Sequence, residues 1–144
     1  MKLYHLTPKR IYEEHIKQEG LIPQPTNPDW DAAVPDSAVF CWPKYNNTMI
    51  KDWVVFNKLK NKNQYNDYVL LQIKVPRKNI LHKLPNGDTL DLFHTLSIDV
   101  TGSHGKTEYV PHNHIPMKLV TEPVPPENIT PILNISTYRA EAIE

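Results

Sequence analysis

The sequence contains little cysteine, little glycine and no excess charge of either sign. Its one cysteine, Cys41, cannot form a disulfide within the chain, which is typical of a protein from a reducing compartment. The 16 basic and 16 acidic residues cancel, so no overall electrostatic field attracts the protein to nucleic acid or to an anionic membrane. Any such partner must therefore be bound by a local group of residues.

Long apolar runs are also missing from the sequence. No run approaches the roughly 20 residues that cross a bilayer, and the N-terminal residues lack the apolar core of a signal peptide. We therefore expect a cytoplasmic protein that has no membrane partner.

Proline, in contrast, is plentiful, with 14 prolines against 4 glycines. Because proline fixes φ and removes a backbone donor, extended segments and rigid loops are expected rather than a long helical bundle. A chain of 144 residues can bury a sizeable core without disulfides, so we expect a single domain over residues 1–144.

The first 20 residues predict a strand followed by a helix. Residues 2–7 alternate between two faces, and this alternation places the ionisable ring of His5 inside the strand. Thr7 is expected to cap the helix, Pro8 to occupy its first position and Gly20 to end it.

The rest of the chain shows further strands and shorter helices, with a long loop after the first helix. Strands dominate the C-terminal half, and prolines within them suit edges and bulges. This order predicts an α+β fold. The expected elements are a loop over 21–37, strands over 38–42, 68–76, 107–116 and 118–135, and helices over 46–63 and 89–97.

Several short motifs in this order resemble the ADP-ribosyltransferase-like superfamily. "YHLT" (4–7) opens the series, and "EGLIP" (19–23), "AVFCW" (38–42), "YVLLQIKVPRKNIL" (68–81) and "EPVPPENITPI" (122–132) follow. The superfamily includes diphtheria-toxin-like transferases, DNA-targeting ADP-ribosyltransferase toxins and RNA 2′-phosphotransferases, and its first strand commonly reads Tyr-His-x-Thr. The resemblance implies a split β-sandwich with short flanking helices, and NAD as the cofactor.

The resemblance also implies a role for the first strand. In the superfamily the histidine of this strand hydrogen-bonds a ribose of the dinucleotide, so His5 inherits that role. Imidazole suits it, because one ring nitrogen can donate a hydrogen bond while the other accepts one. Thr7 could add a hydroxyl or backbone contact to the cofactor, although helix capping also accounts for that residue.

Two further kinds of site residue follow from the resemblance. Trp42 and Tyr45 are the candidates for stacking on the nicotinamide, because an aromatic face attracts a cationic pyridinium ring. Glu108 in "KTEYVPHN" and Glu122 in "LVTEPVPPENI" are both candidates for the catalytic glutamate that holds the ribose hydroxyl and orients the attacking group. Cleavage of the bond between ribose and nicotinamide develops positive charge on the ribose, which a carboxylate stabilises.

Other residues support competing hypotheses. His112 and His114 share one face of an expected strand, and with His104 and Glu108 they could bind zinc or iron. Cys41 is expected to be buried and unreactive in its apolar strand. The lysines of the tract 58–62 could contact nucleic-acid phosphates, or they could simply solvate the end of a helix.

The leading hypothesis is an NAD-dependent ADP-ribosyltransferase that acts on a macromolecular acceptor, either protein or nucleic acid, or performs the related 2′-phosphate transfer on RNA. The alternatives are a catalytically inactive binding module with the same fold and a histidine-rich metal-binding protein. The small size suggests a compact effector, such as a phage-type modifier or a toxin-like module.

Overall fold

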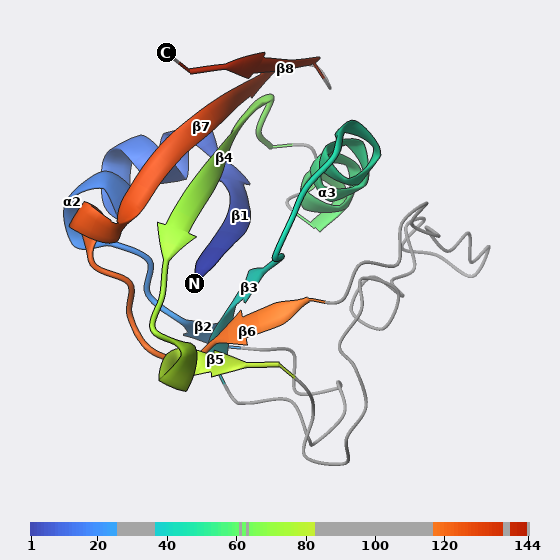
Figure 1. Ribbon diagram of the computed structural model, residues 1–144. Coiled ribbons are helices and arrows are strands. Elements are labelled where there is room, and N and C mark those ends of the chain that lie inside the picture. The colour runs from blue at the N-terminus through green and yellow to red at the C-terminus, as the bar shows by residue number, and fades with distance from the viewer. Residues whose placement is uncertain (26–36, 61, 63, 83–116, 137–138, 144) are drawn as a thin grey trace, which may run out of the picture.

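Two antiparallel sheets and two helical segments make up the part of the chain that the structure describes (Figure 1). This computed structural model describes residues 1–25, 37–60, 62, 64–82, 117–136 and 139–143. The expected mixture of strands and short helices is confirmed. The helix expected over 89–97 and the strand expected over 107–116 lie outside the described residues.

The first sheet is built around a strand that is apolar on both of its faces. In β4, five of the six residues from Tyr68 to Ile73 are buried, as in strands that are covered on both sides. The neighbouring β7 shifts register opposite Leu70 and Leu71, next to Pro131, where a proline without an N–H suits a bulge. The strand order is β1 (Lys2–Pro8), β4 (Asp67–Lys74), β7 (Ile129–Ser136) and β8 (Arg139–Ala142).

The second sheet is shorter, and its strands are two to five residues long. Two of them lie outside the strands expected from the sequence, because a two-residue strand carries no readable period. The order is β2 (Gln24–Pro25), β3 (Ser37–Cys41), β6 (Lys118–Val120) and β5 (Ile80–Leu81). Short helical turns lead into β5 and β7; these are η2 (Arg77–Asn79) and η3 (Pro126–Asn128).

Within the described part of the chain, one backbone bridge joins the two sheets. Directly after β3, Trp42 pairs with Tyr4 of β1, and each N–H donates to the other residue's carbonyl, at 2.8 and 2.9 Å. The segment from β3 to Trp42 therefore pairs with β6 over β3 and then, at Trp42, with β1. The first and second sheets adjoin at this point.

The first helix begins later than expected. It runs over α1 (Lys9–Ile11), a π-helical turn η1 (Tyr12–Ile16) and α2 (Lys17–Glu19). Thr7 does not cap it, because β1 continues its ladder with β4 as far as Pro8, and strand pairing outweighs the local capping preference. Gly20, with φ of +84°, ends the helix as expected.

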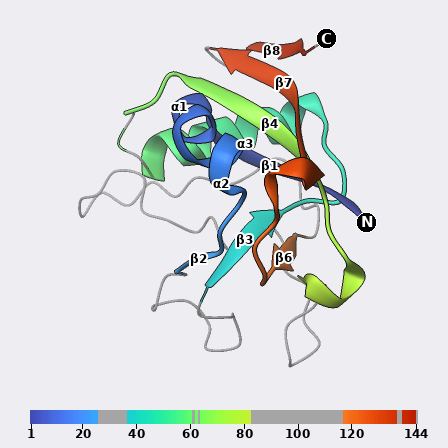
Figure 2. The same cartoon turned by 90° about the vertical axis from the view of Figure 1, so that its left-hand side faces the viewer.

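The helices cover opposite faces of the first sheet (Figures 1 and 2). The expected second helix is present as α3 (Asn47–Lys60), and its apolar stripe is buried, including Trp53. Its start is capped by the Asn46 side chain, which accepts from the Met49 N–H at 2.9 Å. Among the described residues, no helix combines the length and apolar character required of a membrane span.

Candidate functional site

The candidate site lies where β1 and β3 separate. In a regular antiparallel ladder the next hydrogen-bonded pair after Tyr4 and Trp42 would join Leu6 to Phe40. The bridge is isolated, however, and the Phe40 carbonyl instead accepts a 2.7 Å hydrogen bond from Nδ1 of His5. We call this region, formed by Tyr4, His5, Phe40 and Trp42, the seam.

The hydrogen bond to Phe40 determines the proton arrangement of the His5 ring. A carbonyl oxygen can only accept, so Nδ1 must donate, and in the neutral ring Nε2 then carries the lone pair. The ring is half-buried, and its orientation is held by a residue that is 35 positions away in sequence. The seam thus presents an imidazole whose acceptor nitrogen has a defined position.

Aromatic rings surround the seam. Trp42 is 7% exposed and lies against Trp53 of α3, with ring centroids 4.2 Å apart and planes 33° apart. Tyr45 is 38% exposed and meets Tyr4 edge to face at a centroid distance of 4.8 Å. Both predicted stacking residues therefore lie on the Tyr4 face of β1, whereas the His5 side chain belongs to the other face; Tyr45 has the accessible ring, and Trp42 belongs to the core.

Thr7 follows His5 on the same face of β1, two residues along the strand. It is buried, with 4% of its surface exposed. Its backbone is paired with Val69 of β4. The predicted cofactor contact of Thr7 therefore stays a prediction.

Glu122 lies at some distance from the seam. It is exposed, in a bend just after β6. Phe40 pairs with Leu119, so Glu122 is three residues beyond the level of the seam, or about 10 Å along an extended chain. No contact between Glu122 and His5 is present.

The competing candidates fall mostly in the undescribed part of the chain. Glu108 and the three histidines of the hypothetical metal site, at 104, 112 and 114, lie outside the described residues. Within the described ranges, no group of three or more metal-ligating side chains occurs. Cys41 is fully buried, and this burial raises the pKa of its thiol, which confirms the expected burial.

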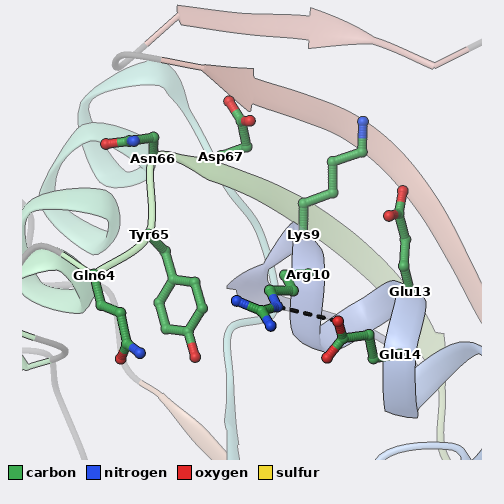
Figure 3. Close-up of a pocket in the computed structure, with 8 residues that line it drawn as sticks. All are labelled: Lys9, Arg10, Glu13, Glu14, Gln64, Tyr65, Asn66 and Asp67. Atoms are coloured by element: carbon green, nitrogen blue, oxygen red, sulfur yellow. Dashed lines mark hydrogen bonds and ion pairs between the residues drawn. The ribbon is translucent and has the colours of Figure 1, made fainter.

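An open cavity of about 450 Å³ lies at the other end of β1 (Figure 3). It is lined by Lys9, Arg10, Glu13 and Glu14 of the first helical segment and by residues 64–67. Within it the Arg10 Nε donates to Glu14 at 3.1 Å, an i, i+4 pair that the sequence spacing could have indicated. The cavity carries none of the predicted cofactor residues.

No protein-family model matches this chain, and no curated protein matches it. The seam is therefore characterised by its own geometry. It holds an oriented imidazole at the junction of two sheets, with Thr7 on the same face of β1 and the accessible ring of Tyr45 against Tyr4 on the other face.

Proposed function

We propose that the protein is an ADP-ribosyltransferase-like enzyme that binds NAD at the seam and transfers ADP-ribose to a protein or nucleic-acid acceptor. The observation that carries the proposal is the position of His5. The histidine of the "YHLT" motif lies at the point where the first strand parts from the neighbouring strand, and a backbone carbonyl holds its ring. A split β-sandwich requires such a separation between its two sheets.

In this proposal His5 positions a ribose of the dinucleotide. The Nδ1–H bond to Phe40 leaves the lone pair on Nε2, which suits acceptance of a hydrogen bond from a ribose hydroxyl. The hydroxyl of Thr7, on the same face of the strand, would provide a second polar contact. Both groups belong to a paired strand, so they would meet the ligand in a nearly fixed geometry.

Tyr45 would supply the aromatic surface for the nicotinamide ring. Its ring is accessible and meets the ring of Tyr4, the residue before His5, edge to face, so the nicotinamide would have to reach around the edge of β1 from the ribose at His5. The cationic pyridinium of NAD is attracted to the face of a tyrosine, and this attraction disappears once neutral nicotinamide has left. Trp42 would support the site from the core, through its backbone bridge to Tyr4.

A glutamate must then meet the ribose on which positive charge develops. Glu122 is accessible, and the loop that carries it follows directly from β6, the partner of β3. Glu108 remains the other candidate. Either carboxylate would stabilise the oxocarbenium-like ribose and orient the attacking group of the acceptor.

Calorimetric titration with NAD and release of nicotinamide from labelled NAD test the proposal together. We expect binding that His5→Asn weakens and that the matched control His15→Asn, on the exposed side of the first helix, leaves unchanged. Either Glu122→Gln or Glu108→Gln should abolish nicotinamide release while preserving binding. A folded protein that shows no binding at millimolar NAD would refute the proposal.

A catalytically inactive binding module is the second candidate. The burial of Trp42 against Trp53, and the exposure of Glu122 away from the seam, favour it over an active site that is already assembled. In that case no nicotinamide would be released, whether or not NAD binds. The two glutamine variants would both behave like the native protein in every assay.

A further inference from the structure

Five basic side chains form a strip at the end of the molecule opposite the open cavity. Lys2 begins β1 and pairs directly with Lys74 at the end of β4. Arg77 and Lys78 follow on the η2 turn, and Lys118 begins β6. These five residues are called the basic strip.

The five residues belong to both sheets and to the η2 turn between them. Lys2 and Lys74 lie on adjacent strands of the first sheet, whereas Lys118 belongs to the second sheet. Burial lowers the pKa of the His82 ring, and the nearby positive charges of Lys118 and Arg77 lower it further. The η2 turn therefore connects the two ends of the strip.

Two exposed acidic residues, Glu122 and Glu127, lie on segments next to the strip, but neither forms an ion pair with it among the residues that the structure describes. Lysines directly opposite each other on neighbouring strands repel, and this arrangement is destabilising. None of the five cations forms an ion pair in the described structure; the ion pair found there joins Arg10 to Glu14, at the other end of β1. In a chain of zero net charge, this is a local excess of positive charge.

We propose that the basic strip binds the phosphate backbone of a nucleic acid. Cations arranged in a row suit the regular negative charge of successive phosphates, and the guanidinium of Arg77 can contact phosphate oxygens in pairs. Among the described residues, the strip offers charge but no aromatic side chain for stacking. Such contacts position a nucleic acid without reading its bases, so the binding is independent of sequence.

The location of the strip also relates it to the proposed active site. The Asn79 carbonyl, at the end of the η2 turn, accepts hydrogen bonds from both the backbone N–H and the hydroxyl of Thr121, at 3.1 and 3.3 Å. Glu122 is the next residue, so a nucleic acid on the strip would pass near this candidate glutamate. Only this link depends on the proposed function; the binding itself needs no NAD.

Fluorescence anisotropy with a labelled single-stranded oligonucleotide of mixed sequence, in the absence of NAD, tests the proposal. If about four phosphates are neutralised, a plot of log affinity against log salt should have a slope of about −3. Lys2→Glu should weaken binding about tenfold and make the slope shallower by about 1. Because this variant places opposite charges on adjacent strands, its melting temperature should stay the same or rise.

The matched control is Lys51→Glu, which makes the same change in net charge on an exposed position of α3. It should bind the oligonucleotide like the native protein. Equal affinities for Lys2→Glu and Lys51→Glu, or no binding at about 50 mM salt, would overturn the proposal. Binding to vesicles of phosphatidylserine without binding to the oligonucleotide would overturn it as well, and would assign the strip to a membrane surface.

Discussion

Replacing His5 by asparagine or by alanine separates its structural role from its role in binding. The asparagine amide can place an N–H close to the position of Nδ1, so it can still donate to the Phe40 carbonyl. It has no equivalent of Nε2. Alanine removes both nitrogens and leaves the carbonyl without its donor.

The 2.7 Å hydrogen bond sets the expected magnitudes. Loss of the bond in a partly buried place should cost about 1–2 kcal/mol for His5→Ala, which lowers the melting temperature of a chain of this size by about 4–8 °C. His5→Asn should stay within about 0.5 kcal/mol of the native protein. If Nε2 binds a ribose hydroxyl, the same variant should raise the Kd for NAD about tenfold.

Urea unfolding followed by tryptophan fluorescence measures the stabilities, because the stacked pair of Trp42 and Trp53 is buried and becomes exposed on unfolding. Calorimetry with NAD measures the affinities. If His5→Asn is as unstable as His5→Ala, the bond to Phe40 does not hold the seam. If His5→Asn binds NAD like the native protein, Nε2 does not contact the ribose.

Three further predictions concern stability and reactivity. Gly20→Ala should lower the free energy of unfolding by about 2–4 kcal/mol in urea titrations, because φ is +84° and an added Cβ would collide with the Val124 carbonyl; a smaller loss would mean that the turn relaxes. Cys41 should react with a thiol reagent only after unfolding, even at about pH 9, since burial raises its pKa; rapid native-state labelling would contradict this. Asn46→Ala should cost about 1 kcal/mol in the same urea assay by removing the cap on the Met49 N–H, and an unchanged stability would show that the cap contributes little.

Periodic patterns predicted the long elements of the fold well. The helix α3 and the strand β4 follow the expected apolar spacing, because each buries enough side chains to show a period. Two-residue strands such as β5 show none, and β5 forms only because β6 is present to pair with it. The start of the first helix was mispredicted at Thr7 because capping is a local signal, whereas the pairing with Val69 is a contact across the sheet.

The candidate site was predictable in its residues but not in its partners. A short motif singled out His5, yet nothing local to that motif indicates the carbonyl of Phe40. Trp42 was chosen for its aromatic ring, and the same ring is what buries it against Trp53. Sequence alone does not distinguish a ring that stacks on a ligand from one that stacks on a helix, because both require a large flat apolar surface.

The seam explains why an imidazole occupies a strand where a leucine would bury more apolar surface. A continuous ladder between β1 and β3 would gain a pair of backbone hydrogen bonds at Leu6 and Phe40, whereas the observed arrangement has one bond from a side chain. A fold selected for stability alone would close this gap. Several side chains can donate one hydrogen bond to a carbonyl, but an imidazole also presents an acceptor nitrogen on the far side of its ring. A ligand at Nε2 would explain the choice of histidine where the bond at Nδ1 alone does not require one, and the asparagine variant tests this hypothesis.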